Sequence, residues 1–175
     1  MPEDEVAHAA GRRFRRVLGQ VPTGVALITA TTPTGPAGMA VNSFTSVSLD
    51  PPLVSFCAAL TSSTWPRIQA AGAFSVNVLG EHHAEVSRRF AQKGADRFAG
   101  LGHRSGATGA PVLDGVAAHL DCEVHAVHDA GDHVIVLGRV VHLDADEGVR
   151  PLIFHGGAYC RLQSSAVPSP RAGAL

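Results

Sequence analysis

The chain has 175 residues and a mass of 18.1 kDa, a size that suits one domain with its own hydrophobic core. Its 14 basic and 15 acidic residues leave a net charge of −1, which argues against a nucleic-acid-binding surface. Three widely spaced cysteines, no apolar run long enough to span a membrane and no apolar segment of a secretory signal indicate a cytoplasmic protein without a disulfide framework.

A helix is expected over residues 5–19, because apolar side chains recur on one face and Gly19 and Pro22 follow. After it, β-branched stretches bounded by Gly, Pro or Asp predict about seven short strands. These strands are expected at residues 25–32, 38–49, 53–60, 74–79, 116–127, 133–143 and 152–162. Two further helices are expected at residues 66–71 and 81–92. Many short strands with few helices favour a barrel or a sandwich over a βαβ fold.

The C-terminal residues 164–175, SSAVPSPRAGAL, have low hydrophobicity and are broken by two prolines. A segment of this composition buries too little apolar surface to fold, so we expect a disordered tail. Residues 1–163 are then expected to form a single domain.

The turn before the second helix, Ser62 to Pro66 (SSTWP), is the first candidate site. Proline suits the first position of a helix. The hydroxyl groups before it can either cap the helix or join backbone N–H groups in binding a phosphate. Arg67, Arg88 and Arg89 are near enough in the sequence to add positive charge. The pattern leaves both a plain cap and a phosphate site open.

The stretch from Gly38 to Ser48 (GMAVNSFTSVS) mixes strand-forming residues with hydroxyl and amide side chains. One interpretation is an edge strand with a polar outer face. The other is a strand whose backbone donors and short side chains line a flat heterocycle rich in nitrogen and carbonyl groups. Periodicity does not distinguish the two.

Histidine provides two further candidates. His133 follows the turn Gly131–Asp132 and opens a strand, where a side chain reaches the rim of a barrel rather than its core. Four alternating residues of the preceding strand share one face: His119, Asp121, Glu123 and His125. Such alternation is normal for a half-exposed strand, and the chain has no close-spaced ligand motif, so no metal site is expected.

Seven stretches are informative in combination: PTGVALITA, GMAVNSFTSVSLDPPLVSF, SSTWPRI, FSVNVL with the SRRFA helix, DRF at residues 96–98, GDHVIVLGRV and PLIFHGGAYCRL. Their order and spacing, from about Phe14 to Leu162, resemble the flavin reductase family with the FMN-binding split-barrel fold. One departure is Ala40, where a threonine is common in the family. This change removes one possible hydroxyl contact and leaves the backbone contacts in place.

The resemblance implies a mainly β fold, a Greek-key split β-barrel with a few short flanking helices. It implies a homodimer with the flavin near the subunit interface. His133 is then the catalytic residue beside the nicotinamide, Tyr159 closes that side, and Arg89 helps to hold the phosphate. The implied cofactor contacts are Met39, Ala40, Val41, Asn42, Ser43, Ser46, Val47, Ser48, Cys57, Ser62, Ser63, Thr64, Trp65, Arg89, Phe90, Phe98, His133, His155 and Tyr159.

The implied activity is that of an NAD(P)H:flavin oxidoreductase, which transfers hydride from NADH or NADPH to FMN or FAD. The reduced flavin would then pass to a partner, a flavin-dependent monooxygenase. Such a reaction needs no catalytic triad, because the cofactors carry the chemistry and the protein sets the geometry.

Two alternatives stay open. One is a non-catalytic split-barrel carrier or sensor that binds flavin or haem, with His133 and His155 as possible axial ligands. The other is a flavin-dependent oxidase of a small substrate, as in relatives of pyridoxamine phosphate oxidase. An oxidase of that kind is expected to carry a richer basic cluster than this sequence shows.

Overall fold

The computed structural model describes residues 3–92, 94 and 96–163. Its elements are α1 (Glu3–Leu18), β1 (Thr23–Gly24), β2 (Ala26–Thr32), β3 (Gly35–Val41), β4 (Thr45–Leu49), β5 (Pro52–Ala59), α2 (Trp65–Ala71), β6 (Ala73–Val78), the 3-10 helix η1 (Glu81–His83), α3 (Ala84–Ala91), β7 (His103–Ser105), β8 (Pro111–Leu113), β9 (Ala118–Ala130), β10 (His133–Ala145), β11 (Ile153–His155) and β12 (Ala158–Cys160). Within this part of the chain, no helix is long and apolar enough to cross a membrane.

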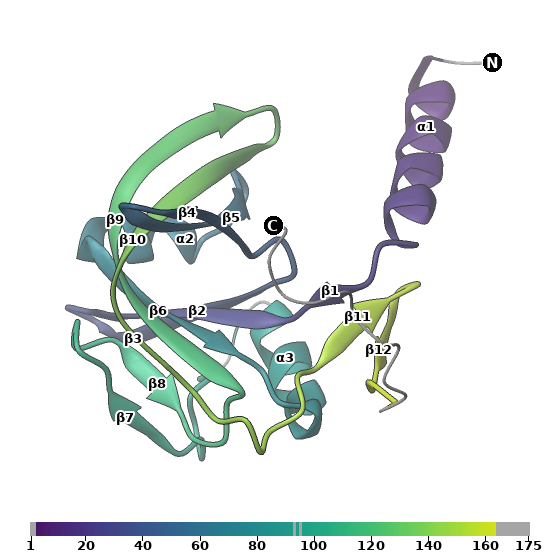
Figure 1. Ribbon diagram of the computed structural model, residues 1–175. Helices are drawn as coiled ribbons and strands as arrows, with labels where there is room; N and C mark the ends of the chain where they lie inside the picture. Colours follow the sequence, from purple (N-terminus) through teal and green to yellow (C-terminus); the bar gives the residue numbers. More distant parts are fainter. Residues whose placement is uncertain (1–2, 93, 95, 164–175) are drawn as a thin grey trace.

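The main sheet is antiparallel and has seven strands in the order β3-β2-β6-β9-β10-β5-β4. It curls on itself (Figure 1), and β3 also contacts β5, so the two edges of the sheet approach each other. Residues 42–44 carry the chain from one edge strand, β3, to the other, β4. Two small sheets, β1-β11-β12 and β7-β8, accompany the barrel. The predicted mainly β split barrel with short helices is confirmed.

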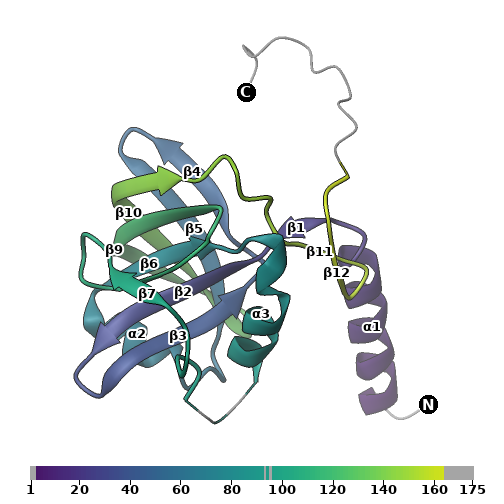
Figure 2. The ribbon, with the colours of Figure 1, turned by 90° about the horizontal axis from the view of Figure 1, so that it is seen from below.

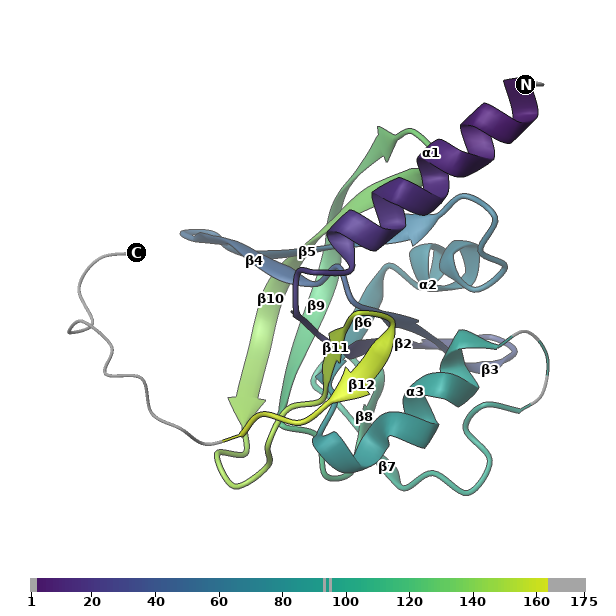
Figure 3. The same ribbon diagram turned by 90° about the vertical axis from the view of Figure 1, so that its right-hand side faces the viewer.

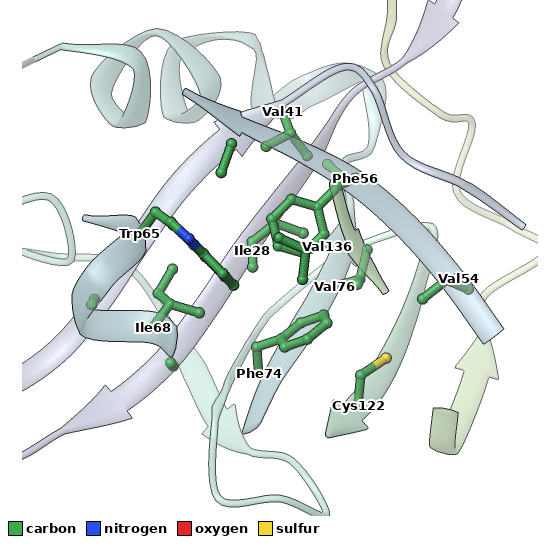
Figure 4. Close-up of a cluster of buried hydrophobic side chains, with 14 of the residues drawn as sticks. Ile28, Val41, Val54, Phe56, Trp65, Ile68, Phe74, Val76, Cys122 and Val136 are labelled. Atoms are coloured by element: carbon green, nitrogen blue, oxygen red, sulfur yellow. The ribbon is translucent and has the colours of Figure 1, made fainter. Parts of the chain in front are cut away.

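Aromatic side chains in the barrel core hold the start of α2 in place (Figure 4). The Phe56 ring meets the rings of Trp65 and Phe74 edge to face, with ring centres 5.7 and 5.5 Å apart. Trp65, the first residue of α2, is only 5% exposed. Because a buried aromatic side chain removes about 150–250 Å² from water, Trp65 fixes the Ser62–Pro66 turn against the barrel.

A second buried cluster packs α3 and the segment after it onto β3. Phe90 and Phe98 meet edge to face, with ring centres 5.0 Å apart. Gly38 of β3 faces them: a Cβ atom added at this position lies 2.5 Å from Phe90 and 3.2 Å from Phe98. Glycine at position 38 therefore allows the aromatic pair to lie directly against the strand.

Helix α1 stands away from the barrel (Figure 1 and Figure 2), and in the view of Figure 3 it lies in front of the barrel strands. Three of its apolar side chains, Phe14, Val17 and Leu18, are 65%, 56% and 52% exposed. Contiguous apolar side chains of this size commonly mark an interaction surface. We call these three residues the α1 surface.

Two predicted strands are divided in the structure. The stretch at 38–49 becomes β3 and β4, because the chain crosses between the sheet edges at residues 42–44. The stretch at 152–162 becomes the β11–β12 hairpin, whose turn uses Gly156 and Gly157 with φ of 59° and 83°. The predicted tail at 164–175 lies outside the described residues, and the single domain over 1–163 stays a prediction.

Candidate active site

The turn before α2 divides its hydroxyl groups between two tasks. The Ser62 hydroxyl accepts hydrogen bonds from the backbone N–H groups of Thr64 and Trp65, at 3.3 and 3.1 Å. Ser62 therefore holds the turn that leads into α2, whose N-cap residue is Thr64. Ser63 and Thr64 instead line a cleft.

This cleft has a volume of about 390 Å³ and lies between the turn, β3 and the segment that follows α3. Its most distinctive feature is a pair of guanidinium groups beside two hydroxyl groups. We call it the arginine cleft. It is lined by Pro36, Ala37, Gly38, Ser63, Thr64, Arg67, Gly94, Asp96, Arg97 and Phe98.

The protein itself positions both guanidinium groups. Arg97 donates hydrogen bonds to the carbonyl oxygens of Gly38 and Gln92, at 2.9 and 2.6 Å, and to the Thr64 hydroxyl at 3.3 Å. Arg67 donates to the hydroxyls of Thr34 and Thr32, at 3.0 and 3.3 Å. A guanidinium carries five N–H donors, so each arginine keeps donors for an anion in the cleft.

Arg97 lines the arginine cleft, and the sequence reasoning did not single it out. The predicted phosphate contact, Arg89, donates to the carbonyl oxygen of Ala99 at 2.9 Å and does not belong to the cleft lining. A signal for Arg97 was present, since it is the central residue of the DRF stretch. Asp96 in that stretch accepts the N–H of Phe98 at 3.1 Å, which forms the turn that directs Arg97 back toward β3.

A smaller and more apolar cleft of about 190 Å³ lies beside the other end of β3. The Tyr159 hydroxyl donates to the Ser87 hydroxyl at 2.8 Å, and the Arg88 guanidinium lies 5.1 Å from the centre of the tyrosine ring. These contacts fasten the β11–β12 hairpin to α3. We call this the tyrosine cleft. Its lining is Val25, Ala40, Val41, Asn42, Ser87, Ala91, Phe154 and Tyr159.

The two clefts are connected by β3. Residues 36–38 of the strand line the arginine cleft, and residues 40–42 line the tyrosine cleft. The two clefts suit the two ends of a flavin nucleotide. The two guanidinium groups and two hydroxyls of the arginine cleft suit a phosphate, and the apolar wall and Asn42 amide of the tyrosine cleft suit a flat heterocycle. The residues present therefore fit a flavin nucleotide laid along β3.

Other predicted contacts form a separate group on β4, β5 and β10. His133 lies opposite Ala59 of β5, and its Nδ1 is 2.7 Å from an Asp132 carboxylate oxygen. This hydrogen bond lowers the pKa of Asp132 below its usual value. The Cys57 N–H donates to the Ser43 hydroxyl at 2.9 Å, and Ser46–Ser48 lie on edge strand β4. The two cleft linings, as the described residues define them, do not include this group.

The remaining predicted contacts are spread through the fold. Trp65 and Phe90 are buried in the two core clusters, and Met39 packs against the first of them. Val47 is half exposed on β4. His155 is exposed on β11, in a different sheet from His133, so the structure does not bring the two possible haem ligands together within one chain. The individual roles stay predictions.

Residues 18–163 match the family model of the flavin reductase like domain. A flavin reductase of Pseudomonas putida is 50% identical over 147 residues, which cover 83% of this chain and 86% of that protein. HsaB, the reductase subunit of a flavin-dependent monooxygenase of Rhodococcus jostii, is 44% identical over 160 residues, covering 91% and 82%. The solved NADH:FAD oxidoreductase SgcE6 of Streptomyces globisporus C-1027, in complex with NAD and FAD fragments, has a TM-score of 0.85 at 36% identity, covering 90% and 96%.

These matches span nearly all of the described barrel and confirm the predicted family and the type of reaction. They also confirm flavin and a nicotinamide dinucleotide as the two reactants. The chain belongs to the flavin reductase family and is an oxidoreductase that acts on flavin with NAD(P)H as the hydride donor.

Proposed function

We propose that the chain holds a flavin nucleotide along β3, reduces it with hydride from NADH or NADPH, and supplies the reduced flavin to a flavin-dependent monooxygenase. The observation that carries this proposal is the pair of clefts at the two ends of one strand. The arginine cleft offers the charges that a phosphate needs, and the tyrosine cleft offers a dry wall for a ring.

Bound flavin supplies the electron-accepting ring of the reaction. Arg97 orients the phosphate with little loss of entropy, because two carbonyl oxygens already hold its guanidinium. Phe154 and Tyr159 exclude water from the tyrosine cleft. The side-chain amide of Asn42 offers its NH₂ group as donor and its carbonyl oxygen as acceptor to the ring edge. The chain's contribution is therefore binding, orientation and exclusion of water.

The proposal includes a homodimer in which each active site uses residues of both subunits. Two observations support it. The α1 surface is exposed, and so are large apolar side chains of β4 and β10, such as Leu49 at 95% and Leu143 at 63%. The group around His133 also lies apart from the two clefts of its own chain. A second copy that covers these surfaces can bring its His133 to the clefts.

Mixing two impaired variants, assayed at an FMN concentration well below the dissociation constant of Arg97→Ala, tests this shared site. Arg97→Ala and His133→Ala each disable a different half of it, and refolding the two together from denaturant gives mixed dimers. If the halves come from different subunits, a mixed dimer keeps one intact site, and the mixture recovers about a quarter of the wild-type activity. No recovery, in a mixture that sedimentation shows to be dimeric, rejects the shared site and leaves the reductase reaction untouched.

The proposal also places the protein in the cytoplasm. Cys57, Cys122 and Cys160 are all free thiols in the structure, as expected in a reducing compartment. Fractionation of cells that express the chain tests this placement.

The reductase activity itself is measured by the loss of NADH or NADPH absorbance with FMN, FAD or riboflavin as acceptor. We expect turnover with at least one nucleotide pair. Transfer is tested by adding a flavin-dependent monooxygenase on the far side of a dialysis membrane: hydroxylated product there shows that reduced flavin leaves the enzyme. Purified, folded protein that oxidises neither nucleotide with any flavin contradicts the proposal.

A further inference from the structure

We propose that His119, Asp121 and His142 bind one divalent transition-metal ion of the Zn²⁺ class, at a site separate from both clefts of the active site. One nitrogen from each histidine and one carboxylate oxygen lie within 4.8 Å of one another. His119 and Asp121 are buried, and His142 is exposed at the surface end of the cluster. Two imidazoles and one carboxylate form a donor set that zinc uses in proteins.

Strand pairing explains why these residues meet. His119 and Asp121 are two residues apart on β9, so their side chains share one face of the sheet. The register of β10 against β9 shifts between Val140 and His142, which makes Val141 the extra residue of a β-bulge and places His142 opposite Asp121. A bulge re-aims the side chains around it. Without this bulge, the alternation of β10 would place His142 on the other face.

The distances suit a common ligand. His142 Nδ1 lies 3.6 Å from an Asp121 carboxylate oxygen, and the two imidazole rings are 5.5 Å apart between centres. Two donors that each lie about 2.1 Å from a tetrahedral metal are separated by roughly 3.4 Å. The Asp121–His142 pair is therefore already close to ligand spacing, and His119 lies near enough for its ring to complete the set by a small rotation.

Burial of Asp121 provides an independent reason for a cation here. Its side chain is fully buried, and one of its oxygens accepts the hydroxyl of Ser75. The other accepts the N–H of Ala107 at 2.9 Å and faces His142. Neutral donors orient this carboxylate, but buried carboxylates are stabilised most by a cation or a metal. The neighbouring cleft of about 240 Å³ includes His119 in its lining, and its charged lining residues are Arg104, Asp114, Asp144 and Asp146, so carboxylates outnumber the one guanidinium and favour cations.

The contact with Arg104 favours the form of His119 whose Nε2 carries a lone pair. The Arg104 guanidinium nitrogen lies 3.4 Å from His119 Nε2. A guanidinium has donors only, so Nε2 must present its lone pair, which is the form that binds metal. Arg104 belongs to the exposed strand β7 and can turn into solvent when an ion enters. It therefore competes with the ion, and its removal should strengthen binding.

The test uses tag-free, chelator-treated protein, with Zn²⁺ in equilibrium dialysis and Co²⁺ as a spectroscopic probe. We expect one bound ion per chain and a cobalt spectrum with nitrogen ligands. His142→Ala should weaken binding by about tenfold or more, because even partners outside the ligand shell contribute that much. His125→Ala is the matched control: it removes an exposed histidine of the neighbouring strand β9 and should leave binding unchanged. Arg104→Ala should tighten it.

Since His142 is exposed, its replacement should leave the fold intact, which a melting curve without metal verifies. A site with a dissociation constant of about 10 μM is roughly 90% occupied at about 100 μM free Zn²⁺, so less than about half an ion per chain at that concentration overturns the proposal. Equal losses in His142→Ala and His125→Ala also overturn it, since they indicate scattered surface histidines. Flavin reduction need not change in any of these variants, so the metal site and the proposed function fail or succeed separately.

Discussion

Arg97→Ala is the substitution that most directly tests how the arginine cleft binds flavin. A hydrogen bond from a charged group to a ligand contributes about 1.5–3 kcal/mol. Because about 1.4 kcal/mol corresponds to a factor of ten, loss of the Arg97 guanidinium should raise the dissociation constant of FMN roughly 10- to 150-fold. Arg97 lines the cleft and also fastens Gln92 to Gly38, so the variant needs a readout that separates these two roles.

Riboflavin provides that readout, because it carries the same ring as FMN without the phosphate. Its affinity, measured by fluorescence quenching, should change by less than about twofold in Arg97→Ala if the arginine acts on the phosphate. Arg89→Ala is the matched control, since Arg89 bonds to Ala99 outside the cleft and should leave both affinities unchanged. An equal loss of FMN and riboflavin binding, or a loss in Arg89→Ala as large as that in Arg97→Ala, refutes the assignment.

Two further predictions concern stability. Gly38→Ala places a methyl group 2.5 Å from Phe90, and such overpacking should lower the free energy of unfolding by about 1–3 kcal/mol in urea denaturation. His83 is buried and accepts the Gly80 N–H through Nδ1; burial lowers its pKa. Around the usual histidine pKa, the unfolded chain then binds more protons than the folded chain. The contribution of His83 to the free energy of unfolding should therefore be fully present above about pH 6.5 and decrease as the pH drops toward the lowered pKa. His83→Asn should flatten this fall, and His125→Asn should not.

The central part of the fold could be predicted from local sequence. The β-branched residues around Ile28 and Val76 form strands close to the expected bounds, because turn residues flank them. The proline of the SSTWP turn likewise marks the start of α2. The stretch at 38–49 was predicted as one strand, since its alternation continues without a break. Its division depends on where the two sheet edges lie, and local periodicity does not contain that information.

The sequence indicates which motifs contribute to the candidate site, but it does not indicate how their side chains are arranged in space. Three consecutive hydroxyl side chains, those of Ser62, Ser63 and Thr64, look equivalent in the sequence. Only the direction of each hydroxyl in the fold decides whether it holds the turn before α2 or lines the arginine cleft. Arg89 and Arg97 are eight positions apart, and both lie well beyond SSTWP in the sequence. In the structure Arg97 lines the arginine cleft and Arg89 does not, because the chain reverses after α3 and returns Arg97 to Gly38. A contact that forms because the chain reverses direction leaves no signal in the amino-acid composition or in the hydrophobic periodicity of the sequence.

The position of β3 at the edge of the main sheet supports the proposal that flavin binds along it. An edge strand pairs on one side only, here with β2, so its outer N–H and C=O groups need other partners. Arg97 takes the carbonyl of Gly38, and the Phe90–Phe98 pair covers the adjacent backbone. Farther along, residues 40–42 border the tyrosine cleft, where small side chains allow a ring to approach the backbone. If a ring binds there as proposed, the backbone groups of β3 offer it donors and acceptors, so the missing hydroxyl at Ala40 should cost little affinity.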